Sequence, residues 1–507
     1  MSSLVNLPSI LTLVAIATGV TLLIKRLSPG KPNGFPLPPG PTPLPIIGSA
    51  LSIDASKPWI TYAKWAASYG DIFMMRVLNQ NIIVVSAERI AKELLERRSR
   101  IYSDRPYLAT REPYGWTFNF GWAAYGDKWR YQRRLFHQVF RADAAVEFRH
   151  LQLQKARKLA FDLLNVPGSY ALHLQRFTAA VIMSIVYDYD IDPHHDHLVE
   201  LFERGNSFAM EALTPEKSAI VSNFPFVLSL PDWFPVLNIG HQASVSTKCA
   251  VEMITRPFDY AYTREAQGVP STAMVPKLLR AAEGADDFAH HLEIIKETSA
   301  TTFSTTTLHS FVLAMVLYPE VQKRAQAEID KVVGRDRLPN FDDRSSLPYV
   351  EAVLKEILRF YPVAPLGIPH ATTTDDVFDG YFIPKGSTIV ANIWAMTRDE
   401  DTYPDPHSFK PERFLIDGKV TDYTCTSSIA FGFGRRICPG RYNADATVWA
   451  AMTSILATLT ISKARDDKGD EIEVNPQFTT GVTSCPLPFP CAFTLRRPGF
   501  DVTKLTE

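Results

Sequence analysis

One cysteine in this chain has surroundings that suit a metal ligand. Residues 431–440 read FGFGRRICPG, so Cys438 lies between glycines, and an alanine-rich helical stretch follows from Tyr442 to Leu459. The N-terminus of a helix supplies positive potential and N–H donors, which keep a thiol deprotonated. Glycines let the backbone turn tightly and approach a flat partner closely. A buried structural thiol is the alternative, but a single axial cysteine suits haem iron, where the thiolate favours O–O cleavage.

The bulk composition is that of an ordinary globular protein. The 507 residues are 46% hydrophobic and 21% charged, and the net charge of −1 gives no electrostatic reason to expect a nucleic-acid partner. The five cysteines show neither a disulfide framework nor paired C-x-x-C spacing, which favours a reducing, cytosol-facing location; they are Cys249, Cys425, Cys438, Cys485 and Cys491.

The N-terminus differs from the rest of the chain in being apolar. Leu4 to Ile24 contains no charge and is long enough to span a membrane, and Lys25 and Arg26 follow it directly. This order predicts an uncleaved signal anchor over residues 1–26, with the downstream chain on the cytoplasmic side. A buried helix of the globular body is the alternative. Residues 27–50 are rich in proline and predict a semi-rigid hinge.

Helical periodicity dominates residues 51–507, and no linker divides them. We predict a fold that is mainly α with a minor β-sheet, in a single large domain. The predicted helices are Trp59–Tyr69, Ala87–Glu96, Asp127–Val139, Ala145–Leu164, Phe288–Leu317, Pro319–Val333 and Pro348–Phe360. The predicted strands are Ile72–Val77, Ile82–Ser86, Thr388–Asn392 and Cys491–Arg496.

Two of these helices contain polar residues at spacings that bring them together. In the first, Asp127 is a candidate N-cap, and Trp129 and Arg133 lie on one face. An indole N–H beside a guanidinium suits a carboxylate. In the other helix, Glu356 and Arg359 are three residues apart, which by itself indicates an ordinary surface ion pair.

Together these segments resemble the cytochrome P450 family of haem-thiolate monooxygenases. The cysteine loop meets F-x-x-G-x-R-x-C-x-G in full, and the chain also contains W-x-x-x-R from Trp129, E-x-x-R from Glu356 and P-E-R-F from Pro411. The resemblance is to fungal microsomal members, including the O-methylsterigmatocystin oxidoreductase-like enzymes of secondary metabolism. It implies the cytochrome P450 fold behind an N-terminal transmembrane helix, with haem b (iron protoporphyrin IX) as the cofactor.

The resemblance also assigns roles to individual residues. Cys438 is the expected axial ligand of the haem iron. The expected propionate-binding residues are Trp129, Arg133, His370 and Arg436, and the expected structural brace of the cysteine loop is a buried triad of Glu356, Arg359 and Arg413.

The implied activity is the oxidation or hydroxylation of a lipophilic small molecule, a secondary metabolite or a xenobiotic, with O₂. Electrons are expected from NADPH through a flavin-containing NADPH-cytochrome reductase, because the chain has no flavin or Rossmann signature; Lys128, Arg130 and Arg134 are candidate docking residues for it. The segments 107–122, 363–368 and 478–482 are mainly apolar and are expected to line the substrate pocket. The implied location is the endoplasmic reticulum membrane, single-pass, with the catalytic domain facing the cytosol.

The helix expected above the haem lacks the family's A/G-G-x-D/E-T-T signature. Residues 294–315 contain no glycine and no acid after Glu297. If about six residues are missing, Ser304 occupies the position of the catalytic threonine; without a gap, Thr302 occupies the acid position and Phe303 the threonine position. The neighbouring hydroxyl residues could position water instead, or serve only as helix residues. An exon boundary assigned wrongly is a further explanation.

Three functions therefore remain open at the level of sequence. The first is a membrane-anchored haem monooxygenase, with Ser304 and Thr302 as candidate catalytic residues. The second is a haem-thiolate isomerase, dehydratase or peroxide-using enzyme, which needs no acid–alcohol pair. The third is a catalytically impaired haem-binding relative.

Overall fold

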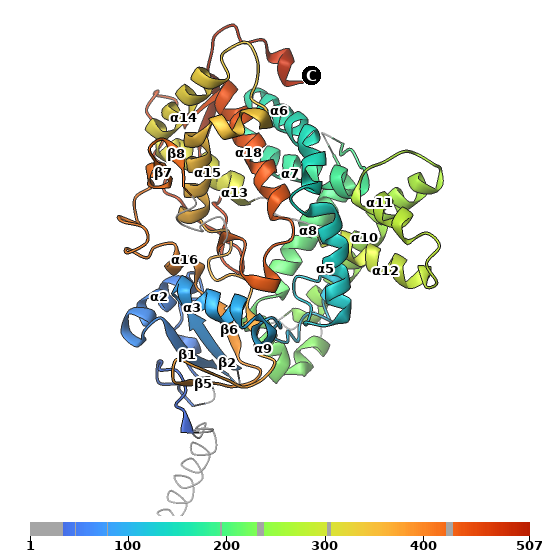
Figure 1. Cartoon of the computed structure of the whole chain (residues 1–507), viewed down its shortest axis with the longest axis vertical. Helices are drawn as coiled ribbons and strands as arrows, with labels where there is room; N and C mark the ends of the chain where they lie inside the picture. The colour runs from blue at the N-terminus through green and yellow to red at the C-terminus, as the bar shows by residue number, and fades with distance from the viewer. Residues whose placement is uncertain are drawn as a thin grey trace, which may run out of the picture.

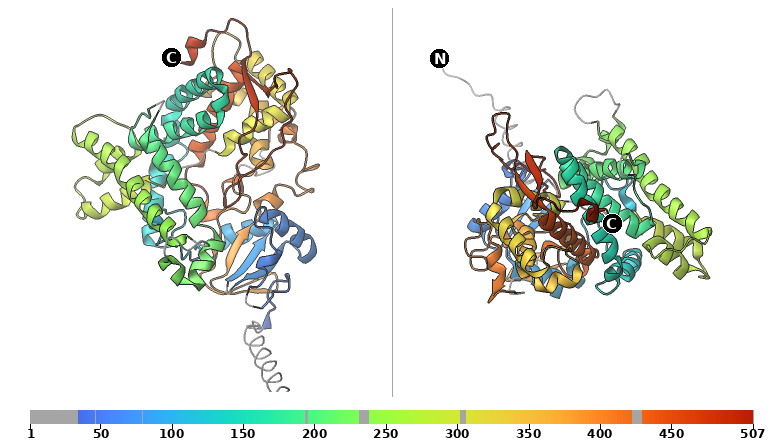
Figure 2. Two further views of the ribbon diagram at one scale, coloured as in Figure 1. Left: turned by 180° about the vertical axis from the view of Figure 1, so that it is seen from behind. Right: turned by 90° about the horizontal axis from the view of Figure 1, so that it is seen from above.

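The computed structural model describes residues 34–506 apart from 46, 79, 193–194, 231–237, 302–305 and 422–428. A large helical region and a smaller β-rich region make up one domain, with the sheet and the described N-terminal residues at one end and the C-terminus at the other (Figures 1 and 2). The longer helices of the first half are α2 (Pro58–Tyr69), α5 (Asp127–Phe140), α6 (Arg149–Asn165), α7 (Tyr170–Tyr187), α8 (His197–Ala212), α9 (Pro215–Asn223) and α10 (Ile239–Ala266). Those of the second half are α11 (Met274–Ala282), α12 (Phe288–Ser299), α13 (Thr306–Leu317), α14 (Pro319–Val332), α15 (Pro348–Phe360) and α18 (Arg441–Thr458).

The main sheet has four strands in the order β1-β2-β6-β3, which are Ile72–Val77, Gln80–Val85, Thr388–Ala391 and His370–Ala371. β1 pairs with β2 antiparallel, β2 with β6 parallel, and β3 with β6 antiparallel, so that His370 lies opposite Ile389. A second, two-stranded sheet joins β9 (Leu459–Lys463) to β10 (Cys491–Leu495). The sheets are minor elements beside the helices, as predicted.

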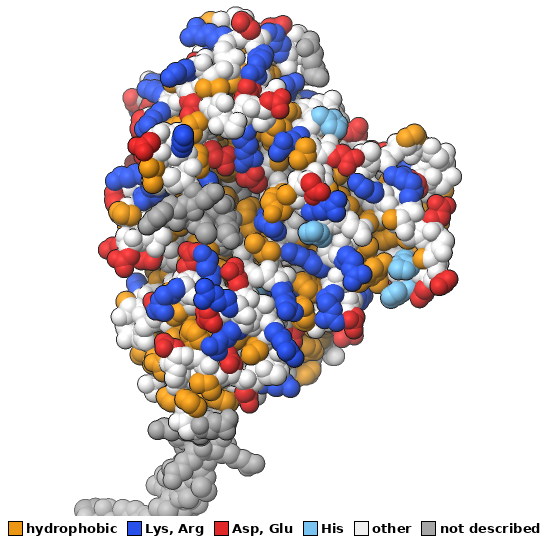
Figure 3. All heavy atoms as spheres, in the orientation of Figure 1, with side chains coloured by type: hydrophobic (Ala, Val, Ile, Leu, Met, Phe, Trp, Pro, Cys, Tyr) orange, Lys and Arg blue, Asp and Glu red, His pale blue; other side chains and the backbone are white. Residues whose placement is uncertain are grey.

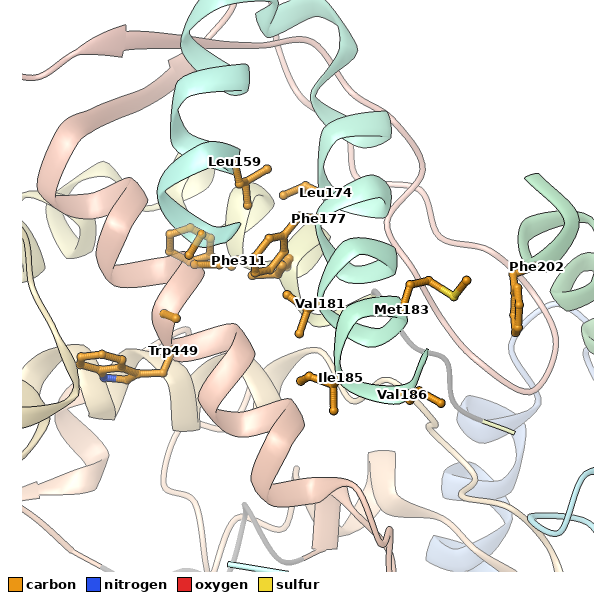
Figure 4. Packing of buried hydrophobic residues seen from close by; sticks show 14 of the residues in the cluster. Leu159, Leu174, Phe177, Val181, Met183, Ile185, Val186, Phe202, Phe311 and Trp449 are labelled. Atoms are coloured by element: carbon orange, nitrogen blue, oxygen red, sulfur yellow. The ribbon is translucent and has the colours of Figure 1, made fainter. Parts of the chain in front are cut away.

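The largest hydrophobic core lies between the long helices. Figure 4 shows Leu159 of α6, Phe177 of α7 and Phe311 of α13 packed toward one another, and Trp449 of α18 belongs to the same cluster. These four side chains are at most 4% exposed. Burying each of these side chains contributes about 1.5–3 kcal/mol to the free energy of folding. This packing fixes α18, which begins directly after the cysteine loop.

Several predicted elements are confirmed at or near their bounds. α15 and β1 match the predicted ranges, and α2 and α14 differ from them by one residue. The predicted helix Ala87–Glu96 is instead α3 (Glu88–Lys92) followed by a π-helical turn, Glu93–Arg97. Asp127 is not an N-cap as predicted, because Gly126 holds that position and Asp127 is the first helical residue.

The prediction of one continuous helix over Phe288–Leu317 was wrong. α12 ends at Ser299 and α13 begins at Thr306. Hydroxyl side chains bond back to the preceding turn at three places, since Thr298 Oγ1 donates to Ile294 O (2.6 Å), Ser299 Oγ to Lys296 O (2.9 Å) and Thr301 Oγ1 to Glu297 O (3.2 Å). Such bonds compete with the backbone ladder and weaken a helix.

Within the described part of the chain, no helix is both long and apolar enough to cross a membrane. The predicted anchor, Leu4–Ile24, lies outside those residues, as does most of the N-terminal half of the predicted hinge.

Candidate active site around Cys438

A cavity of about 470 Å³ lies beside the cysteine loop. Its wall combines that loop with α5, α7, α8, the end of α12, the start of α13 and the segments around 363–370 and 482–483. Cys438, Trp129, Arg133, His370 and Arg436 all line it. The structure therefore brings together, from three separate stretches of sequence, the residues expected to bind haem.

Local hydrogen bonds hold the cysteine loop in shape. The N–H of Cys438 donates to Phe431 O at 2.8 Å, and the turn between them contains a short 3₁₀ segment, Gly434–Arg436. Burial is the largest influence on the Cys438 thiol and raises its pKa, while the backbone N–H of Gly440 at the start of α18 and the charges of Arg133 and Arg441 act in the opposite direction. Metal coordination is what would make this enclosed thiol a thiolate.

Gly434 fits where no other residue does. Its φ is +54°, and a Cβ added there would lie 2.1 Å from the carbonyl oxygen of Leu95 in the π-helical turn. The backbone of the cysteine loop thus packs directly on Glu93–Arg97. Gly440 is under no such constraint, since its φ is −88° and an added Cβ would contact only the ring of Phe136 at 3.8 Å.

We expect Gly434→Ala to displace the cysteine loop and lower haem content per polypeptide several-fold, because the methyl group and the backbone of residue 95 cannot share the same space. Haem content by the pyridine haemochrome method, with the thermal midpoint, measures the effect. Gly469→Ala is the matched control, because Gly469 also has positive φ (+87°) but has no atom near the added Cβ. Equal haem content in the two variants would contradict the prediction.

Helix α5 presents Trp129, Arg133 and Phe136 to the cavity, at spacings of four and three residues. The prediction that Trp129 and Arg133 share a face is confirmed. Arg133 forms no ion pair or hydrogen bond with a described residue, and its burial lowers its pKa to about 10. The Arg133 guanidinium is therefore available to pair with an anionic group of a bound cofactor.

Arg436 is held at the cavity by two backbone carbonyls. Its Nε donates to Ser103 O at 2.7 Å and its Nη2 to Ala123 O at 2.8 Å, while its guanidinium lies 4.2 Å from the centre of the Trp129 ring. The third nitrogen, Nη1, is buried and has no hydrogen-bond partner among the described residues. Burial lowers the pKa of Arg436 to about 10. An unpartnered buried donor of this kind indicates a missing anionic acceptor.

Arg105 is a third cavity arginine, and sequence reasoning did not find it. Its Nε donates to Gly121 O (2.9 Å), and its Nη1 donates to Ile368 O (2.8 Å) and Pro369 O (2.7 Å). These bonds tie two segments of the cavity wall together through a buried cation that forms no ion pair with a described carboxylate. In the sequence, Arg105 is marked only by its position just before the aromatic segment 107–122.

His370 lies on β3 with its Nδ1 2.7 Å from Tyr102 O, so Nδ1 carries the hydrogen. Burial and then the charge of Arg105 hold its pKa well below the usual range, and the imidazole is neutral. A neutral ring with a proton on Nδ1 has a bare Nε2, which cannot donate to an anion. An adjacent carboxylate would raise the pKa of His370 and restore that donor.

These residues fit haem b. Three guanidinium groups, those of the buried Arg105 and Arg436 and the partly buried Arg133, line one cavity where none forms an ion pair with a described carboxylate, and two propionates would balance them. Cys438 would bind the haem iron, and Trp129 and the three arginines would bind the haem propionates. Bound haem would supply the chemistry of dioxygen.

We expect Arg133→Gln to weaken haem retention by roughly tenfold or more, the value of a lost charge-assisted hydrogen bond. The rate of haem transfer to excess apomyoglobin measures it. The same change should raise the thermal midpoint of the haem-free protein, because it removes a partly buried charge that no described carboxylate compensates. A lower midpoint together with unchanged haem transfer would refute the assignment.

The cytochrome P450 family model matches residues 38–488. The chain belongs to the cytochrome P450 family. It is 38% identical to cytochrome P450 monooxygenase claR of Ampulloclitocybe clavipes, over 96% of this chain and 92% of that protein. It is 36% identical to monooxygenase COX2 of Coprinopsis cinerea (96% and 94% covered) and to monooxygenase 98 of Postia placenta (91% of each). The fold, the haem cofactor and the class of enzyme, a cytochrome P450 monooxygenase, follow from this membership.

The distal wall of this cytochrome P450 is formed where the long helix is interrupted. Ala300 and Thr301 follow the end of α12, Thr307 and Leu308 lie in the first turn of α13, and all four line the cavity. The candidate catalytic residues Thr302 and Ser304 lie outside the described residues, so their role stays a prediction. The end of α12 is also tied to α5, because Glu297 accepts from Lys128 Nζ (2.7 Å) and Gln132 Nε2 (3.1 Å).

The predicted triad lies between these distal residues and the cysteine loop in sequence, and it is fully formed. Glu356 and Arg359 are 0% exposed and 2.7 Å apart, and Arg413 Nε lies 3.2 Å from Glu356. Arg359 also donates to the carbonyls of Thr397 and Pro406 at 2.9 Å. The pair is not the surface ion pair that its spacing alone indicated. It joins α15 to the irregular segment that precedes the cysteine loop.

All three segments expected to face the substrate contribute to the cavity wall. They do so through Trp116, Phe120 and Trp122, through Val363, Ala364 and Ile368, and through Val482. Helices α7 and α8 also line the cavity, which sequence reasoning did not predict.

Proposed function

We propose that this cytochrome P450 oxidises a lipophilic small molecule of the secondary-metabolite type. The observation that carries the proposal is the cavity itself, where Cys438 and the arginines occupy one part of the wall and mainly apolar or aromatic side chains occupy the rest. Apolar walls with a few polar groups select hydrophobic ligands.

Electrons for this reaction come from NADPH through a separate flavoprotein, the NADPH-cytochrome reductase. Lys and Arg side chains gather over α5 on the face in Figure 3. Arg134 of α5 is exposed and forms no ion pair or hydrogen bond with a described residue. Two of the predicted docking residues are already paired within the protein, since Lys128 contacts Glu297 and Arg130 contacts Asp127. Arg134 is thus the basic group of α5 most available to an acidic partner.

The test combines spectroscopy with isotopic labelling. The reduced, carbon monoxide-treated protein should show the strongly red-shifted Soret band of a thiolate-bound haem. With reductase, NADPH and a panel of lipophilic compounds, one atom of ¹⁸O from ¹⁸O₂ should appear in the product. Turnover that proceeds with peroxide but never with NADPH and O₂, or an isomerised product without ¹⁸O, would contradict the proposal.

The proposed location is the endoplasmic reticulum membrane, with the catalytic domain in the cytosol. The uncharged stretch Leu4–Ile24, followed by Lys25 and Arg26, supports it. Deletion of residues 1–26 should move most of the protein from the microsomal pellet to the supernatant and leave the Soret band intact. Full retention of the truncated protein in the pellet after a high-salt wash would contradict a single anchor at the N-terminus.

A further inference from the structure

Helix α8 presents one polar side chain to the cavity within an otherwise apolar row. Asn206, Ala209, Met210 and Leu213 line the cavity, and their spacing of three and four residues puts them on one face of the helix. The neighbouring Gly205 packs on α10 instead, so closely that an added Cβ would meet the Met253 side chain. Asn206 therefore belongs to the cavity face.

The carboxamide of Asn206 has no partner in the described part of the protein. It is partly buried, and it forms no hydrogen bond with a described residue. Most other neutral polar side chains of the wall use a polar atom within the protein, as do Asn119, Thr178, Thr301, Thr447 and Thr483. Among the amide and hydroxyl side chains of the wall, Thr307 on α13 is the other one that forms no hydrogen bond with a described residue.

An unbonded amide in an apolar wall is unfavourable when the cavity holds only an apolar ligand. Packing alone would favour an aliphatic residue at this position of the row. A carboxamide both donates and accepts, so its natural partner is a neutral oxygen group. A carboxylate is matched less well, because the α8 row contains no cation and the cavity arginines lie on other elements.

We propose that Asn206 recognises a neutral oxygen group, a carbonyl or a hydroxyl, on the substrate. This inference rests on the proposed function and narrows its substrate class to a hydrocarbon skeleton that already carries oxygen. A reaction that introduces this oxygen must therefore precede this enzyme in the sequence of reactions.

The test uses the full-length holoenzyme and pairs of probes that differ by one oxygen: adamantane with adamantan-1-ol and adamantan-2-one, and trans-decalin with 2-decalol and 2-decalone. Optical titration of the haem Soret band gives each Kd. In at least one pair the wild type should bind the oxygenated member about tenfold more tightly, the value of one neutral hydrogen bond. Asn206→Leu should reduce that ratio toward one. Ser207→Ala, a change at the exposed neighbouring position of α8 that does not line the cavity, should leave the ratio unchanged.

The outcomes separate this inference from the function on which it rests. Equal affinities in every pair, a preference retained by Asn206→Leu, or no binding of any probe to a protein with an intact red-shifted Soret band would each overturn the role of Asn206. Absence of that band would instead overturn the proposed function.

Thermal unfolding of the ligand-free holoenzyme gives an independent readout. Asn206→Leu should raise the midpoint by a few degrees, because an unbonded amide is replaced by an apolar side chain of similar size in an apolar wall. A fall in the midpoint would mean that the amide supports the fold, and would overturn the proposal.

Discussion

Replacing Cys438 by serine abolishes the red-shifted Soret band of the reduced, carbon monoxide-treated protein and reduces monooxygenase turnover to background. The serine hydroxyl cannot replace a thiolate as the axial ligand, although the surrounding N–H donor and arginines are unchanged. The measurement is the reduced carbon monoxide difference spectrum at equal polypeptide concentration, followed by NADPH-dependent turnover.

The control for this experiment is Cys491→Ser. Cys491 is also partly buried, but it lies on β10 and does not line the cavity. Its variant should keep both the band and the turnover. A band of normal height in Cys438→Ser would show that a different residue binds the iron.

Replacing Arg359 by methionine is expected to cost about 3–5 kcal/mol of folding free energy, because it leaves the carboxylate of Glu356 buried without its main partner. Both side chains are 0% exposed. Most of the expressed protein should then be insoluble or free of haem, and any soluble fraction should unfold at a markedly lower temperature.

The double variant Glu356→Gln/Arg359→Met tests the reason for this loss. It removes both charges, so it should be more stable than Arg359→Met alone. The surface pair Arg324–Glu412 is the matched control, because its side chains are 56% and 46% exposed. Arg324→Met should change stability by less than about 1 kcal/mol. Equal losses in Arg324→Met and Arg359→Met would refute a special role for the buried triad.

The sequence predicted elements best where one face is apolar and the other polar. α15 and β1 were found at their bounds for this reason. Helices α7 to α11 were not predicted. α7 is buried on most sides, so its pattern lacks a polar stripe, and α10 contains Pro257 within the helix, where a proline usually predicts an end.

The sequence predicted those residues of the site that belong to short sequence motifs. Cys438, Trp129, Arg133, His370 and Arg436 were named from short patterns, and the structure places them around one cavity. Arg105 and the α8 row were missed because their roles arise from contacts between distant segments. Arg105, for example, bonds to Ile368, which is 263 residues away.

The cavity wall consists of two parts. The side chains of one part hold other segments of the fold in place, and the side chains of the other part only line the cavity. Arg105 and Arg436 hold the cysteine-loop side together through backbone carbonyls of several segments, so that almost any substitution there disturbs more than one element. The α8 row contributes side chains that end at the cavity. Variation at residues 206, 209, 210 and 213 therefore changes what the cavity accepts while leaving the support of the cofactor intact. The architecture separates evolvability from stability, and a combinatorial library restricted to these four positions should yield new selectivity with haem content preserved.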